Sequence, residues 1–481
     1  MDELDLSILK KRSVHGVIAL ISRTFVLNLI SLVSFVVISS QLAASQLGVY
    51  VAVIAIQRVI SFFTDFGLGA ALVQKKEEIN NEDIKTAFTL QSGITLSVFL
   101  IVFLLRGFIS DFFHLNMAAE ALLLVLVFTI FLSSFKTIPS ILLERHVNFQ
   151  KLVVPQIAES LAFNVILIFL LFQNFGISSF TWAFLISALI GIPVYYFVSP
   201  WKPALGINRN SLGFLRYGVA FQAKNILATV KDDLLTVILT KFLTFTEIGY
   251  IGFAQRLSFF VYRYIVDSVT KVSFSTYSRI QESKEVLKTA IEKSLFFISL
   301  TMFPLLLGLI ATAPYIIQYY SKWNKWEPAV VSIVFFSLNA LISSISGILV
   351  NVLDATGRVK TTLKLMVFWT TATWVLTPLL IRMYGYNGVS LASFLVALSV
   401  VITIYLVKKV VDFEFIKSIY KPALASIVMF AFVIAFERLF VTGFVTLGAA
   451  IVLGGALYSA IMFLIGRNEF LSDVKAILRK E

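Results

Sequence analysis

Long apolar stretches separated by short polar segments dominate this sequence from residue 14 to residue 465. A helix needs about 20 mostly apolar residues to cross the roughly 30 Å hydrocarbon core of a bilayer. Fourteen stretches approach or exceed that length: 14–39, 48–72, 86–105, 119–143, 153–172, 177–199, 213–239, 247–270, 289–311, 328–350, 361–381, 386–407, 420–437 and 442–465. The pattern predicts an all-α polytopic membrane protein with about 14 transmembrane helices.

The placement of basic residues supports this count and predicts an orientation. With fourteen spans, 27 Lys and Arg residues fall on or beside the termini and one alternating set of connections, and 6 fall on or beside the other set. Basic connections face the cytoplasm in membrane proteins, so both termini are expected there. The first span follows an acidic start (Met1–Asp5) and is too long for the apolar part of a signal peptide. We therefore expect no cleavable leader.

Composition excludes several classes of function. Hydrophobic residues make up 58% of the chain and charged residues 14%, against roughly 25% charged in a soluble domain. The net charge of +13 is explained by basic connections beside anionic lipid, so no nucleic-acid partner is expected. The chain has no cysteine and three distant histidines, and it contains no phosphate-binding loop or hydrolase motif. We expect no metal, no cofactor and no enzymatic activity.

A weak internal repeat predicts the domain organisation. QLAASQLGVYVAVIAIQR (residues 41–58) resembles KFLTFTEIGYIGFAQR (residues 241–256), and each places a Gly and a Tyr at the start of a span. Two parallel six-helix lobes are expected, 1–205 and 206–410. Residues 411–481 then form an appended helix pair with a cytoplasmic tail.

Charged residues inside the predicted spans mark the candidate site, because an ionised side chain at the bilayer centre costs at least about 2.5–3.5 kcal/mol. They gather on the first two helices of each lobe. The cations are Arg23, Arg58, Lys224, Lys231, Arg256 and Arg263, and the carboxylates are Asp65, Asp232, Asp233 and Asp267, with Glu159 in the fifth span.

Helical spacing relates these charges to one another. Arg58 and Asp65 lie seven residues apart, as do the lysine pair and the arginine pair of the second lobe, so each pair shares a helix face. Asp267 is four residues beyond Arg263, within pairing distance. Arg23 and Arg58 are expected to be unpaired and to face a cavity. The competing interpretation is that these charges form interhelical pairs that only fix packing.

A cationic, hydrated cavity between two apolar lobes favours an anionic amphiphile. Arginine grips phosphate oxygens with two parallel hydrogen bonds. A lipid pyrophosphate carrying a glycan fits such a cavity if its acyl tail lies outside, between helices. Asp65, Glu159, Asp232, Asp233 and Asp267 are either carriers of a coupling ion or structural pairing partners.

The sequence also resembles a known family. KKRSVHG before the first span, LGVYVAV, and above all FTDFGLGAALVQKKE (residues 63–77) are similar to bacterial polysaccharide repeat-unit exporters, the O-antigen-type flippases. These belong to the multidrug/oligosaccharidyl-lipid/polysaccharide (MOP) exporter superfamily, with the lipid II flippases and the MATE-type drug/cation antiporters.

The resemblance implies a flippase of the bacterial inner membrane. It would carry an undecaprenyl-pyrophosphate-linked oligosaccharide to the outer leaflet by alternating access. The implied partners are that glycan lipid and the membrane lipids, with a polysaccharide polymerase and glycosyltransferases as further candidates.

Two alternatives remain open at this point. A drug/cation antiporter of the same superfamily would need an acidic or aromatic cavity for organic cations. A membrane glycosyltransferase or polymerase would need catalytic acids and large outer loops. The longest predicted outer connections are short, around 106–118 and 312–327.

Overall fold

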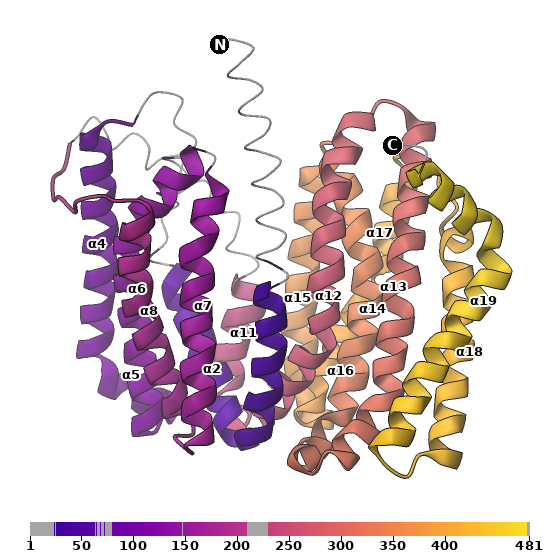
Figure 1. Cartoon of the computed structure of the whole chain (residues 1–481), viewed down its shortest axis with the longest axis horizontal. Helices are drawn as coiled ribbons and strands as arrows, with labels where there is room; N and C mark the ends of the chain where they lie inside the picture. Colours follow the sequence, from indigo (N-terminus) through magenta and orange to yellow (C-terminus); the bar gives the residue numbers. More distant parts are fainter. Residues whose placement is uncertain are drawn as a thin grey trace. The chain divides into compact units, whose positions relative to one another are not determined.

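The computed structural model describes residues 24, 26–62, 64, 68, 72, 79–146, 148–208 and 229–478, without the side chains of residue 264 and residues 466–478. All regular secondary structure in this described part is helical, as Figure 1 shows. The predicted all-α class is therefore confirmed. The chain divides into two compact units, Met1–Gly249 and Tyr250–Glu481.

The described part of the first unit includes an apolar helix, Val26–Gln41. It continues through α2 (Ala44–Phe62), α4 (Asn81–Leu104), α5 (Arg106–Phe113), α6 (Met117–Arg145), α7 (Phe149–Phe172), α8 (Ser178–Val198), the π-helical turn η2 (Val230–Leu234), α11 (Leu235–Leu239) and the start of α12 (Phe245–Ile280). Helix α8 packs on both α6 and α7, and α6 also packs on α2 and α4.

The second unit contains the rest of α12 and the remaining helices. These are α13 (Lys284–Tyr319), the 3-10 helix η3 (Ser321–Ala329), α14 (Val330–Ala355), α15 (Val359–Tyr384), α16 (Asn387–Ala397), α17 (Val400–Lys408), α18 (Phe415–Phe440) and α19 (Phe444–Leu478). Helix α13 packs on α14, α18 and α19. Its fully buried Leu287, Ile291, Leu295 and Ile298 belong to an apolar core of this unit.

Eleven helices in the described part are long and apolar enough to cross a membrane. The other three predicted spans fall on Val26–Gln41, on η2 with α11, and on α12. Helix α12 has a low mean hydropathy because it carries several charged residues. Every predicted span therefore coincides with helix in the described part, and the chain is a multi-pass membrane protein.

Asparagine fixes the starts of three helices in the first unit. The Asn80 side chain accepts a hydrogen bond from the backbone N–H of Asp83, whose carboxylate accepts one from the Asn80 backbone, at 2.7 and 3.2 Å. Asn116 and Asn148 cap α6 and α7 in the same way. These caps satisfy N–H groups that helix geometry leaves without intrahelical partners.

Two glycines allow α2 and the start of α12 to approach closely. A Cβ atom on Gly48 would overlap the backbone carbonyl of Phe245, and one on Gly249 would overlap the carbonyl of Ala44. Gly48 and Gly249 are the glycines of the two repeat segments, LGVY and IGY. Small residues at such a crossing let backbones pack without intervening side chains.

We expect Gly48→Ala to destabilise the protein, because its methyl group forces the two backbones apart. Overpacking of this kind costs about 1–3 kcal/mol. The measurement is the thermal midpoint of the purified protein in detergent. Gly93→Ala on α4 is the control, since no heavy atom lies within 4 Å of a Cβ there. A midpoint for Gly48→Ala equal to that of the control would contradict the close crossing.

Candidate functional site

Four predicted site residues of the first unit lie on α2 and on the turn η2, and they form two ion pairs. Arg58, in the C-terminal half of α2, pairs with Asp233 of η2, with 3.2 Å between Nη1 and Oδ1. Lys231 pairs with the neighbouring Asp232 at 3.8 Å. The sequence interpretation that leaves Arg58 unpaired is therefore wrong, since its partner lies 175 residues away in the chain.

The local backbone explains how these residues come together. Val230–Leu234 forms a π-helical turn, which widens the helix by one residue. Such turns occur mostly as single insertions in α-helices and are frequent at functional sites. Asp233 on this turn reaches Arg58, while Lys231 and Asp232 are more exposed. The four side chains carry two positive and two negative charges, so this cluster is neutral overall.

The arrangement leaves Arg58 able to bind a second anion. More than half of its side-chain surface is exposed, 57% against 20% for Asp233. One guanidinium nitrogen contacts Asp233, and a guanidinium carries five N–H donors in all. A phosphate could therefore be held by the remaining donors or could displace the carboxylate.

Glu159 on α7 is a predicted site carboxylate that pairs with a mostly buried lysine. Lys136 of α6 pairs with it at 2.5 Å, and the two side chains are 14% and 27% exposed. The carboxylate also lies over Gly191 of α8, where a Cβ would sit 2.9 Å from its Oε2. The pair thus joins three packed helices. Of the two roles left open for Glu159, the contacts support structural pairing.

The predicted site residues of the second unit lie on α12. Arg256, Arg263 and Asp267 are all exposed on that helix. Arg256 makes an interaction within the chain. No ion pair joins Arg263 to Asp267 in the part of the chain that the structure describes, so the expected pairing is not formed.

Three predicted site residues, Arg23, Lys224 and Asp65, lie outside the described residues. Their assignment to the site stays a prediction. Within the described residues, no group of three or more His, Cys, Asp or Glu side chains is arranged to hold a metal ion.

Glu437 is a buried acid that the sequence analysis passed over. It is only 2% exposed on α18, and neither carboxylate oxygen has a hydrogen-bond partner among the described residues. Val433 and Val441, one turn away on either side, are buried too. Glu437 is the last residue of the predicted thirteenth span, where an acid is expected to reach water. Helix α18 continues to Phe440 and packs against α13 and α19, and Glu437 is buried on this helix.

The fold resembles those of solved membrane proteins. It is similar to the lipid II flippase MurJ in an inward closed conformation, with a TM-score of 0.75 and 18% identity over 94% of this chain and 99% of that chain. It is also similar to an inward-facing multidrug resistance MATE family transporter of the MOP superfamily. There the TM-score is 0.63 and the identity 12%, over 82% and 98%.

The family of this chain is identified from its sequence. Residues 37–331, more than half of the chain, match the family described as "Polysaccharide biosynthesis protein". The chain belongs to this family, and the predicted resemblance is confirmed.

Two curated relatives agree. The lipopolysaccharide biosynthesis protein WzxC of Escherichia coli (strain K12) is 23% identical over 83% of this chain and 81% of its own length. The succinoglycan biosynthesis transport protein ExoT of Rhizobium meliloti (strain 1021) is 24% identical over 59% and 57%.

We expect Lys136→Met and Glu159→Gln to destabilise the protein separately more than they do together. Removing one partner leaves the other charge enclosed without compensation, which costs about 3 kcal/mol, whereas replacing both removes that penalty. The measurement is a double-mutant cycle, in which the thermal midpoints of the wild type, the two single variants and the double variant are compared. Additive effects would show that the pair contributes no coupling.

We expect Glu437→Leu to raise the thermal midpoint, because a buried polar group without partners costs about 1–3 kcal/mol. Glu414→Leu is the control, since that carboxylate is exposed and already paired. A lower midpoint for Glu437→Leu would mean that the carboxylate has a favourable partner. Loss of transport together with a higher midpoint would assign Glu437 a functional role.

Proposed function

We propose that this protein is a flippase for a lipid-linked oligosaccharide. It carries a polyprenyl-pyrophosphate glycan from the cytoplasmic to the outer leaflet of the bacterial inner membrane by alternating access, for surface polysaccharide synthesis. Both termini lie in the cytoplasm, and the protein transports its substrate without catalysing a reaction on it. A polysaccharide polymerase and glycosyltransferases act beside it on the same glycan.

The family match carries this proposal, because it covers residues 37–331 and connects the chain to polysaccharide synthesis. One relative is named as a transport protein for succinoglycan biosynthesis. The lipid II flippase structure matches 94% of the chain and the MATE transporter 82%. The flippase structure matches more of this chain than the MATE structure does, and this favours a flippase over an antiporter.

Exposed arginines supply the chemistry that this substrate needs. A pyrophosphate offers several oxygens to charge-assisted hydrogen bonds, each contributing about 1.5–3 kcal/mol. Arg58 in the first unit and Arg263 in the second are exposed and have donors to offer. In this mechanism Asp233 holds Arg58 in place in the absence of substrate and yields it to the incoming phosphate.

A drug/cation antiporter remains the alternative. An organic cation would be held by carboxylates or aromatic faces, and the neutral cluster around Arg58 offers no excess of negative charge. Drug resistance on overexpression, without any change in surface polysaccharide, would favour the antiporter.

We expect Arg58→Ala and Arg263→Ala each to lower transport at least about tenfold, the effect of losing about 1.4 kcal/mol of binding. The measurement is surface polysaccharide in cells whose only copy of the gene is the variant, with the undelivered glycan lipid counted in the membrane. Arg382→Ala on α15 removes another exposed arginine, which lies outside the proposed site, and is the control.

The variant Asp233→Asn distinguishes a substrate-binding role of Arg58 from a purely structural one. If Arg58 binds the substrate, freeing it from Asp233 leaves transport unchanged or raises it. If the ion pair only fixes packing, Asp233→Asn lowers transport and the thermal midpoint as Arg58→Ala does. Normal export in Arg58→Ala and Arg263→Ala would overturn the assignment of these residues.

A further inference from the structure

A pocket of about 520 Å³ opens between the end of α17 and the start of α18 in the second unit. Ile404 and Lys408 of α17 line it, with Glu414 and the α18 residues Phe415, Ile416, Lys417 and Tyr420. Its volume lies within the range of about 300–1,000 Å³ that small-molecule sites occupy. None of these residues belongs to the proposed glycan site.

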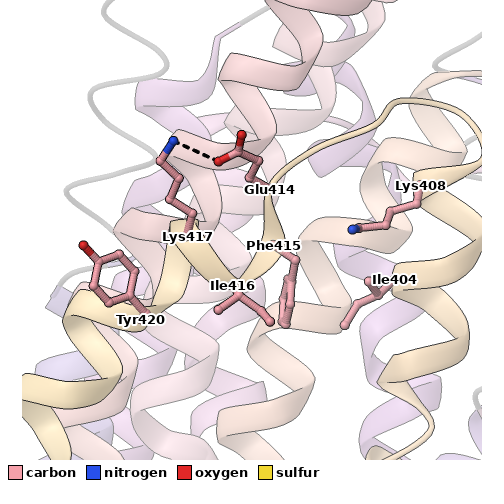
Figure 2. A pocket seen from close by; sticks show the side chains of 7 residues that line it. All are labelled: Ile404, Lys408, Glu414, Phe415, Ile416, Lys417 and Tyr420. Atoms are coloured by element: carbon pink, nitrogen blue, oxygen red, sulfur yellow. Dashed lines mark ion pairs between the residues drawn. The ribbon is translucent and has the colours of Figure 1, made fainter.

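The polar and apolar lining residues are segregated. Figure 2 shows Lys408, Glu414 and Lys417 along one rim, and Ile404, Phe415 and Ile416 together below them. Such a pocket matches a molecule with a charged end and an apolar body. The phenol of Tyr420 adds an amphipathic group at the α18 side, as is typical of membrane interfaces.

The rim carries a net positive charge. Lys417 pairs with Glu414 at 2.9 Å. That contact lowers the pKa of Glu414 below its ordinary value, first through the hydrogen bond and then through the charge of Lys417. Glu414 therefore stays ionised and compensates one lysine. Lys408 extends from α17 toward the pocket with no ion pair in the described residues, which leaves one positive charge for a ligand.

The apolar part of the pocket continues along the helices. On α18, Ile416, Tyr420, Leu424 and Ile427 recur at spacings of four, four and three, so they share one face, and all are exposed. On α17, exposed Val401 lies one turn before Ile404. Helix α18 packs mainly on α13 and α19, and α17 on α14. An extended apolar chain can therefore lie along the faces that α17 and α18 leave exposed.

We propose that this pocket binds one anionic phospholipid of the surrounding bilayer, with the phosphate at Lys408 and Lys417 and an acyl chain along the exposed face of α18. Basic pockets between transmembrane helices on the cytoplasmic side are suited to anionic headgroups. The sequence assigns the connection from Lys408 to Lys421 to that side. The lipid is a resident partner of the fold and not the transported glycan.

Lipid binding by delipidated protein tests the proposal. Native mass spectrometry would measure binding of dioleoyl phosphatidylglycerol and of dioleoyl phosphatidylcholine, which share their acyl chains. We expect one site that prefers phosphatidylglycerol about tenfold, because only this headgroup carries a net negative charge for Lys408 and Lys417 to attract. Lys408→Ala/Lys417→Ala should reduce this preference to near one. Lys360→Ala/Lys364→Ala on α15 removes the same charge from exposed positions and should retain the preference.

Two further arms identify the ligand. Soluble glycerol phosphate at the same concentration should not displace the lipid, because it lacks the acyl chain. Ile416→Ser should weaken binding of both lipids and leave the preference between them unchanged. Thermal midpoints of all variants, measured without added lipid, exclude loss of the fold.

Three outcomes would overturn the proposal. Equal binding of the two lipids by wild type would exclude headgroup recognition. Equal loss of preference in the α15 control would assign the effect to overall charge. Full displacement by glycerol phosphate would indicate a site for a soluble organic phosphate.

Discussion

The free-energy cost of an isolated charge in a low-dielectric, apolar environment determines where this protein can place its charged side chains. Hydrocarbon offers no water to solvate an ionised group, so such a side chain must find a partner within the fold or reach an aqueous space. Lys136 and Glu159 meet this requirement by pairing at 2.5 Å across α6 and α7, beside Gly191 of α8. Arg58 and Asp233 meet it in a more exposed position at the end of α2. The same constraint makes Glu437 unusual, since its carboxylate has no partner in the described structure.

The two ion pairs differ in what they leave available. The Lys136–Glu159 pair is enclosed and joins three helices, so it stabilises packing. Arg58 is 57% exposed and retains donors beyond the one that contacts Asp233. In the proposed mechanism, the incoming phosphate competes with Asp233, on the π-helical turn, for Arg58.

Family and fold constrain different parts of the function. Membership of the polysaccharide biosynthesis protein family points to the cargo class, and the likeness to MurJ and to a MATE transporter shows the architecture. At 18% and 12% identity, the structural likeness defines the fold and not the ligand. The pocket between α17 and α18 is separate from this proposed cargo site, and we propose that it binds a bilayer phospholipid.

The sequence by itself determined the all-helical membrane class, the fourteen apolar segments and the position of most charged residues relative to them, because hydrophobic length and lysine and arginine placement are local properties. It also drew attention to Gly48 and Gly249 through the repeat. Only the tertiary structure decided which charges pair: Arg58 finds Asp233, Lys136 finds Glu159, and Arg263 does not pair with Asp267. The burial of Glu437 could not be predicted from the sequence either, since it depends on how other helices pack around α18. Partners distant in the chain are chosen by helix packing, and helical spacing within one segment carries no information about that.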